Sequence, residues 1–281
     1  MKIAAAVILY NPTEKQISNA LSYTESFDFV FVVDNSEPDY PRNYSSMFLE
    51  NMKYIDMKGN EGLPNAYNTI LNSQDINDYD FLCTLDQDSE FNKSDIEYIR
   101  KLIHKLSEGD SKFSTKNIGI IAPTIDYGVK KINYNCSVEE RERVITSGSF
   151  VNIKAIQRYG LRYDPNYFID KFEIDLCTQL RRKGLKVCVL GNAILHQRLG
   201  EMGKLSHSVH NPLRHYYLFR NRLYYNHKFY SLIKRWGLNV LQTIKHIIII
   251  LLYEDQKFAK ISQLPKAISD YCGGKMGKRI V

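Results

Sequence analysis

Long hydrophobic runs are absent from this chain of 281 residues. Its longest late apolar run, Ile247 to Leu252, is far shorter than the roughly 20 residues that a membrane-spanning helix needs. The apolar stretch at the start of the chain resembles the core of a secretion signal, but no small-residue cleavage site follows it. We therefore expect a buried first strand at the N-terminus and no segment that crosses a bilayer.

Patterned cysteines are absent as well, since the five cysteines show no CxxC spacing. Neither a zinc site nor a disulfide framework is indicated. An odd number of scattered thiols is typical of a reducing compartment, so we expect a cytoplasmic protein. A hydrophobic content of 44% is ordinary for a globular protein. The length allows one large α/β domain with an appended element.

A net positive charge is absent from most of the chain and is confined to its end. From Arg214 onward there are 13 lysines and arginines against 3 acidic residues, while the preceding part is slightly acidic. A basic segment favours anionic partners such as nucleic acid, phospholipid headgroups or phosphorylated substrates. We expect peripheral contact with anionic lipid at the inner face of the cell membrane. Assembly of a homo-oligomer through the C-terminal helices is the alternative.

Short apolar strands alternate with helical stretches in the first half of the chain. The expected strands are 3–9, 29–33, 81–85 and 118–122, and the expected helices are 14–24, 62–71 and 93–106. This pattern predicts an α/β fold with a mostly parallel central sheet flanked by helices on both faces. In such sheets ligands bind beyond the carboxyl ends of the strands, where Asp34 and Asp86 lie.

The pattern loosens after Thr146. A helix is expected over 170–183 and a strand over 187–190, and the chain looks helical from Pro212 onward. We divide the chain into an α/β domain of residues 1–211, with halves at about 1–120 and 121–211, and a basic helical C-terminal extension of residues 212–281.

The segment Asp86-Gln87-Asp88 places two carboxylates around one residue directly after an expected strand. Both can meet one cation, and hard divalent cations such as Mg²⁺ or Mn²⁺ take oxygen ligands. Such a cation would neutralise a bound diphosphate and make it a better leaving group. The alternative is a polar turn in which an aspartate caps the next helix.

Eight segments together carry a family resemblance. They are 9–12, 32–36, 60–68, 85–89, 146–149, 168–177, 196–200 and 215–222. In this order the chain resembles the family-2 inverting glycosyltransferases of the GT-A fold, and it looks most like bacterial rhamnosyltransferase-type enzymes. The resemblance implies metal-assisted single displacement from dTDP-rhamnose or a UDP-hexose. The implied acceptor is a glycan, a lipid-linked sugar or a glycoprotein, in polysaccharide biosynthesis.

The resemblance also implies roles for individual residues. Asp34 would accept a hydrogen bond from a pyrimidine N–H, unless it only forms a turn. The full donor-binding set is Tyr10, Asn11, Asp34, Asn60, Gly62, Asp86, Gln87, Ser147 and Arg220, and the metal set is Asp86, Asp88 and His196. Plain structural roles remain open: a helix N-cap for Asn60, a loop for Ser147, a structural histidine at 196 and a solvated basic face for Arg220.

Asp170, Glu173 and Asp175 are the acids from which a general base would come. On an expected helix Asp170 and Glu173 share a face, and Asp175 points elsewhere. An inverting transfer needs one carboxylate to remove the proton of the acceptor hydroxyl. With Asp175 held in register, Glu173 falls where the resembled family has its catalytic aspartate, and Phe172 stands where that family has a glutamate. We expect Glu173 to be the base, with Asp170 in reserve; acids that only favour the helix dipole are the alternative.

Two other functions compete with sugar transfer. A sugar nucleotidyltransferase also uses paired carboxylates, but this chain has no glycine-rich phosphate loop near its N-terminus. A basic nucleic-acid-binding protein would use the C-terminal extension, but the apolar run Ile247 to Leu252 fits packing or membrane contact better. We therefore expect no nucleic-acid partner.

Overall fold

The computed structural model describes residues 1–108, 114–128, 138–197 and 210–279. The chain forms two compact units. The first consists of Met1–Asp164 and Glu173–Arg198, and the second of Pro165–Phe172 and Leu199–Val281. The short segment 165–172 therefore belongs with the C-terminal part of the chain.

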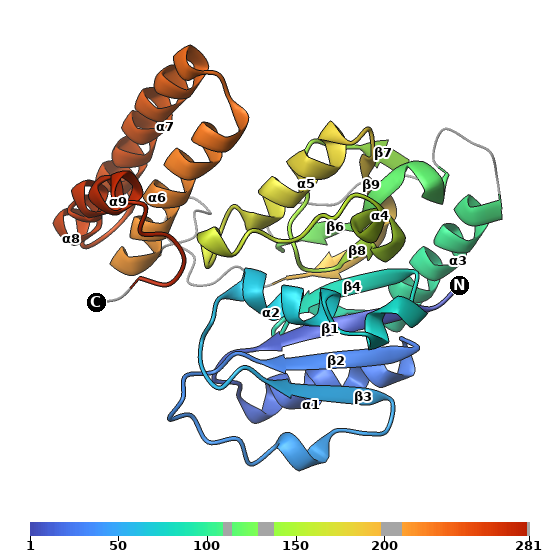
Figure 1. Cartoon of the computed structure of the whole chain (residues 1–281). Coiled ribbons are helices and arrows are strands. Elements are labelled where there is room, and N and C mark those ends of the chain that lie inside the picture. The colour runs from blue at the N-terminus through green and yellow to red at the C-terminus, as the bar shows by residue number, and fades with distance from the viewer. Residues whose placement is uncertain (109–113, 129–137, 198–209, 280–281) are drawn as a thin grey trace. The chain divides into compact units, whose positions relative to one another are not determined.

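The first unit is built on one sheet (Figure 1), whose N-terminal half is parallel. In spatial order this half consists of β3 (Met52–Asp56), β2 (Phe29–Asp34), β1 (Ile3–Leu9) and β4 (Phe81–Asp86). Every residue of β1 is buried, as expected for a central strand covered on both faces. The parallel sheet expected from the sequence is confirmed for these strands.

The later strands make the sheet mixed. The order continues with β8 (Ser149–Asn152), β6 (Ile118–Asp126), β9 (Lys186–His196) and β5 (Glu90–Phe91), and β7 (Val138–Glu140) also pairs with β9. β8 runs antiparallel to both β4 and β6, whereas β6 and β9 are parallel. The expectation of a mostly parallel sheet therefore describes the first half better than the second.

Helices cover both faces of this sheet (Figure 1). They are α1 (Glu14–Ser22), α2 (Leu63–Leu71), α3 (Lys93–Glu108), α4 (Ile153–Arg158) and α5 (Phe172–Arg182). Short 3₁₀ turns occur at Tyr23–Glu25, Ser45–Met47, Asp75–Asp78, Thr115–Asn117 and Pro165–Tyr167. Alternate residues of β1, such as Ala5 and Val7, share one core cluster with residues of α1 and α3. Since β-strand side chains alternate, the intervening residues of β1 face the side where α2 packs.

One expected helix begins later than the sequence pattern suggested. The helix expected from residue 170 is α5, which begins at Phe172. Asp170 and Lys171 have φ angles of 57° and 74°, in the left-handed region that a right-handed helix excludes. The expectation that Asp170 and Glu173 share a helix face is therefore wrong.

The second unit is helical, as expected, and contains α6 (Pro212–Phe229), α7 (Leu232–Tyr253), α8 (Lys257–Ile261) and α9 (Gln263–Cys272). Asn211 caps α6 by accepting a hydrogen bond from the backbone N–H of Arg214 at 2.8 Å. Aromatic residues of α6 form a small core with Ile250 of α7 and Ala267 of α9. Among the described residues, α7 alone is long and apolar enough to cross a membrane by length and composition, although the sequence reading expected no such segment.

Candidate functional site

The predicted donor-binding residues of the N-terminal half gather at one edge of the sheet. In the strand register Leu9 lies beside Asp34, and Ile8 lies beside Asp86. The carboxyl ends of β2 and β4 therefore flank the end of β1, where Tyr10 follows. This is the edge at which parallel α/β sheets bind their ligands.

The turn after β4 is fixed by side chains on both sides. The Gln87 amide accepts a hydrogen bond from the Tyr10 backbone N–H at 2.8 Å and donates one to the Tyr10 carbonyl at 3.2 Å. The Asn19 amide of α1 donates to the Gln87 carbonyl at 3.1 Å and to the Ser89 carbonyl at 2.9 Å. Asp88 is exposed between these contacts and lines a hollow of about 180 Å³ against α1.

Ser147 forms hydrogen bonds to this turn. Its buried hydroxyl accepts a hydrogen bond from the Asp86 backbone N–H at 3.3 Å and shares a short one with the Ser89 hydroxyl. Gly148 has a φ of 77°, and a Cβ there would lie 2.9 Å from side-chain atoms of Leu195 and Pro123. The sequence needs glycine here to bring the serine under the turn. The direct contact of Ser147 with a donor sugar stays a prediction.

The oxygen atoms around Asp86 suit a hard divalent cation. Asp86 accepts a hydrogen bond from the Gln197 amide nitrogen at 3.1 Å, while the amide oxygen of Gln197 is buried and has no donor among the described residues. Together with the exposed Asp88, these are oxygen ligands of the kind that Mg²⁺ and Mn²⁺ prefer, and a diphosphate would complete the coordination. The donor set therefore fits the predicted metal.

His196 makes a different contact. Its Nδ1 lies 3.2 Å from a carboxylate oxygen of Asp126, and its side chain is 48% exposed. Within the part of the chain that the structure describes, no three histidine, cysteine or acidic side chains come together as a metal site. Its role as a metal ligand stays a prediction.

Asp34 is completely buried and forms several hydrogen bonds. It accepts them from the hydroxyls of Tyr44 and Tyr54, each at 2.7 Å, and from the Ser36 backbone N–H at 3.0 Å. The Arg42 guanidinium lies 3.3 Å from the same carboxylate. Burial alone would raise its pKa, but the bonds from Ser36, Tyr54 and Tyr44 outweigh burial and hold the pKa of Asp34 below its ordinary value. The structure gives Asp34 a stabilising role at this edge, and its contact with a pyrimidine stays a prediction.

Asn60 and Gly62 lie in the segment that leads into α2. The Asn60 side-chain oxygen accepts hydrogen bonds from the Asn35 amide and from the Gly62 backbone N–H, each at 3.2 Å. The N-cap is Gly62, with a φ of 84°, so the N-cap role considered for Asn60 is wrong. Asn11 also has a positive φ, 44°, and its N–H donates to the Ser36 hydroxyl at 2.8 Å. These contacts fix the backbone of both segments beside the end of β1.

The candidate bases lie in different units. Glu173 is half-buried in the first turn of α5, in the α/β unit. Asp170 lies in the helical unit, where Arg214 donates to both of its carboxylate oxygens at 3.0 and 3.2 Å. Asp175 is fully buried and accepts a hydrogen bond from Gln179. Asp170 would have to leave its ion pair with Arg214 to accept a proton.

The loop that carries Asp170 is held by two neighbouring residues of α6. The Asn221 amide donates to the carbonyls of Tyr167, Ile169 and Asp170 at 2.9, 2.6 and 3.1 Å. Arg220 has no exposed surface, and its guanidinium donates to the Tyr167 carbonyl at 3.4 Å. Its predicted contact with the donor diphosphate stays a prediction and would require the guanidinium to become accessible.

Comparison with known proteins identifies the family. Residues 10–186 match the model described as Glycosyl transferase family 2. The chain belongs to glycosyl transferase family 2. No curated protein sequence matches the chain significantly.

Solved structures place this family-2 transferase in the GT-A fold. The structure of S. aureus TarS 1–349 in complex with UDP-GlcNAc has a TM-score of 0.59 at 14% identity, covering 96% of this chain and 80% of that one. The structure of GalNAc-T7 with UDP, GalNAc and Mn²⁺ has a TM-score of 0.56 at 11% identity, covering 70% of this chain and 44% of that one. At such low identity these likenesses establish the fold.

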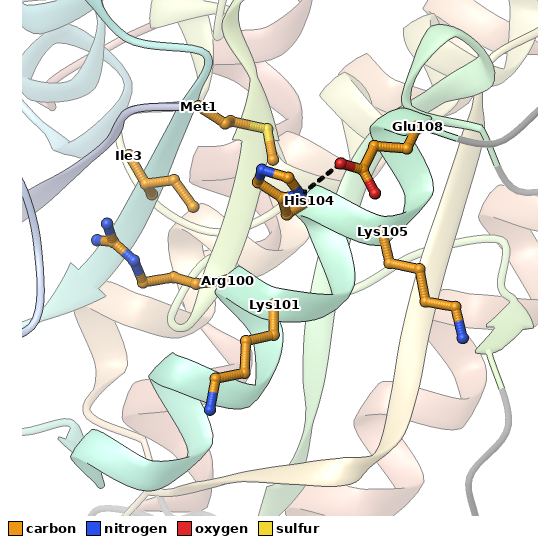
Figure 2. Close-up of a pocket in the computed structure, with 7 residues that line it drawn as sticks. All are labelled: Met1, Ile3, Arg100, Lys101, His104, Lys105 and Glu108. Atoms are coloured by element: carbon orange, nitrogen blue, oxygen red, sulfur yellow. Dashed lines mark ion pairs between the residues drawn. The ribbon is translucent and has the colours of Figure 1, made fainter.

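A larger hollow of the transferase, about 350 Å³, lies far from this chemistry (Figure 2). It is formed by Met1, Ile3 and the α3 residues Arg100, Lys101, His104, Lys105 and Glu108. Arg100 is paired with Asp28 at 3.0 Å, and His104 with Glu108 at 3.3 Å. It adjoins the start of β1, whereas the predicted site lies at the carboxyl end of that strand. We therefore do not assign it to the transferase site.

Sequence reasoning missed two residues, one beside Asp86 in the α/β unit and one that holds the loop of Asp170 in the helical unit. Gln197, beside Asp86, was overlooked in favour of its neighbour His196. Asn221 was overlooked in favour of Arg220, because nothing in the local sequence shows that its amide donates to carbonyls more than 50 residues away.

Proposed function

We propose that the protein is an inverting glycosyltransferase that takes a sugar from a nucleotide-diphosphate donor with the help of Mn²⁺ or Mg²⁺. Membership of glycosyl transferase family 2 supports sugar transfer. The nucleotide donor is supported by the neighbours of similar fold, one of which is described with UDP-GlcNAc and another with UDP, GalNAc and Mn²⁺.

The observation that carries the proposal is the pair of carboxylates that follows β4 at the carboxyl edge of the sheet. Asp86 accepts a hydrogen bond from the Gln197 amide, and Asp88 is exposed. A diphosphate would bind at this edge. A bound divalent cation neutralises the leaving diphosphate. Tyr10 and Gln87 hold the turn between the two carboxylates through their reciprocal hydrogen bonds.

Glu173 acts as the general base in this proposal. It takes the proton of the acceptor hydroxyl while that oxygen bonds to the anomeric carbon, and the bond from this carbon to the diphosphate oxygen breaks. One displacement from the opposite face inverts the anomeric centre. Asp170 is the reserve candidate, and Arg214 donates to both of its oxygens.

The substrates follow from the sequence resemblance. We propose dTDP-rhamnose or a UDP-hexose as donor, so that the enzyme is a hexosyl- or deoxyhexosyltransferase. The acceptor is a glycan, a lipid-linked sugar or a glycoprotein. The reaction would take place in the cytoplasm, as part of polysaccharide biosynthesis.

A donor screen tests the proposal. The full-length protein is incubated with UDP-, dTDP- and GDP-sugars and with Mn²⁺ or Mg²⁺, and the released nucleoside diphosphate is measured. Nuclear magnetic resonance of the product gives the anomeric configuration, which we expect to be inverted. Consumption of a nucleoside triphosphate with release of pyrophosphate would instead identify a nucleotidyltransferase.

The metal site is tested by Asp88→Asn. We expect the variant to stay folded and to lose transfer and most Mn²⁺ binding, as measured by electron paramagnetic resonance. Asp78→Asn, which changes an exposed acid in a 3₁₀ turn of the same unit, is the matched control. Normal turnover and normal Mn²⁺ affinity in Asp88→Asn would show that the metal is bound elsewhere.

A further inference from the structure

α7 has the reverse of the usual amphipathic pattern. The face that packs on α6 is polar up to the buried Ile250 near its end. The Asn226 amide of α6 donates to the side-chain oxygens of Asn239 at 2.7 Å and Gln242 at 3.1 Å. One turn further along, the His246 ring lies 2.9 Å from the ring of His215 on α6. These residues recur every three or four positions, so they form one side of the helix.

The opposite side of α7 is apolar and exposed. It carries Ile233, Trp236, Val240, Ile244, Ile248 and Leu251, which are between 46% and 88% exposed. Leu241 and Leu252 lie beside this stripe and are each 65% exposed, and Phe258 of α8 is 93% exposed. Large contiguous apolar surfaces on a folded protein mark a site of contact with a membrane or another protein.

The contacts of α7 argue against a membrane-spanning orientation. The helix is long enough to cross a bilayer, with a mean hydropathy of 1.4. However, Arg222 of α6 donates to the Gln242 carbonyl of α7 at 2.9 Å, so the two helices are joined by polar contacts. A spanning α7 would draw the arginines of α6 into hydrocarbon, which is strongly unfavourable. A helix lying in the plane of the interface buries only its apolar side.

The charge around the apolar face selects between a lipid surface and a second copy of the chain. Lys234, Lys245 and Lys257 are exposed on α7 and α8, next to the apolar residues. The chain from Arg214 onward carries 13 basic against 3 acidic residues, so two copies facing each other would repel. The same charge is attracted to acidic headgroups, and an exposed tryptophan such as Trp236 is suited to the headgroup region.

We propose that the outward face of α7 binds in the plane of an anionic lipid bilayer and anchors the protein to it as a peripheral membrane protein. Apolar side chains supply the insertion, and the flanking lysines supply the preference for acidic lipid. All the contacts behind this proposal lie within the helical unit, and lipid binding does not depend on the sugar that the enzyme transfers.

The first experiment measures binding of the full-length protein to vesicles by sedimentation. One set contains phosphatidylcholine alone, and the other also contains phosphatidylglycerol. We expect clear binding to the acidic vesicles. The affinity for the neutral vesicles should be lower by about tenfold or more. Equal binding to both would overturn the role of charge, and no binding to either would overturn the proposal.

Variants separate the apolar face from general stickiness. Leu241→Ser combined with Leu252→Ser should weaken binding to acidic vesicles by about tenfold or more, because two insertable side chains are lost. Leu49→Ser, at a residue that is 56% exposed in the other unit, is the matched control and should bind normally. Circular dichroism checks that all variants are folded. Normal binding by the double variant would overturn the proposal.

Two further readouts address the other occupants of this face. Trp236 is the single tryptophan, so its quenching by lipids brominated at different depths reports the position of α7. We expect strongest quenching near the headgroups, and strongest quenching at the bilayer centre would show a spanning helix instead. Analytical ultracentrifugation without lipid should show a monomer. A dimer that Leu241→Ser with Leu252→Ser dissociates would assign the face to a second copy.

Discussion

A buried pair of histidines should make the protein sensitive to mild acid. His246 on α7 and His215 on α6 lie 2.9 Å apart, and His215 lies 2.9 Å from Glu254. Burial, together with the nearby Arg222, lowers the pKa of His246 to about 3. The folded chain therefore keeps this ring neutral at a pH where an unfolded chain would protonate it.

The sign and size of the effect follow from this shift. An unfolded histidine has a pKa of 6.5, so stability is unaffected above that value and is lost as the pH falls from 6.5 toward 3. Each pH unit in this window costs about 1.4 kcal/mol, which gives about 2 kcal/mol at about pH 5. Burial lowers the pKa of His215 too, so His215 also lowers the free energy of unfolding as the pH falls. Lys260 and His215 lower the pKa of Glu254 against the effect of burial. The stability that ionised Glu254 contributes is therefore lost only below its ordinary pKa of 4.5.

Urea unfolding of the full chain near neutral pH and near pH 5, followed by circular dichroism and by Trp236 fluorescence, measures this loss. In His246→Gln the loss between the two conditions should shrink by about 2 kcal/mol, since glutamine does not titrate. His104→Gln, at a surface histidine on α3, is the control and should lose as much as the original protein. An unchanged pH dependence in His246→Gln would refute the reasoning.

Two further predictions concern the site. Glu173→Gln should lower kcat by about 10²- to 10⁴-fold while the donor Kd stays constant, because only proton acceptance is lost. Asp170→Asn should lower kcat less. If steady-state kinetics show the larger loss in Asp170→Asn, the base is Asp170. Asn221→Leu removes the amide that donates to three loop carbonyls, of which the Tyr167 carbonyl keeps its bond from Arg220, so the free energy of unfolding should fall by about 1–3 kcal/mol. Urea unfolding measures this change, and unchanged stability would show that other contacts hold the loop.

The N-terminal half of the fold could be predicted because its signals are local. β1 has the bounds expected from its apolar run, and the strand-end aspartates at 34 and 86 lie on one edge as expected. β3 was missed because it is an edge strand that alternates between polar and apolar residues and is only partly buried. β8 was missed because it has only four residues, and its insertion between β4 and β6 is a long-range event.

The site could be predicted as a set of positions but not as a set of contacts. Tyr44 and Tyr54 contact Asp34 from 10 and 20 residues away, and no short motif encodes that arrangement. The left-handed backbone at Asp170 is supported by Asn221, which is 51 residues away. The helix expected from the sequence began at Asp170 because a local pattern carries no information about a contact with a residue so far away in the chain.

The helical unit consists of two separate stretches of the chain, and this affects how chimeric transferases can be built. Residues 165–172 fold with the C-terminal part of the chain although they precede α5. A hybrid that receives a foreign C-terminal region by a single crossover after β9 would keep its own loop and lose the Asn221 amide that binds it. The loop and the helices are one transplantable module encoded by two separate stretches, so a working exchange needs two crossovers around residues 165–172 as well as the one after β9.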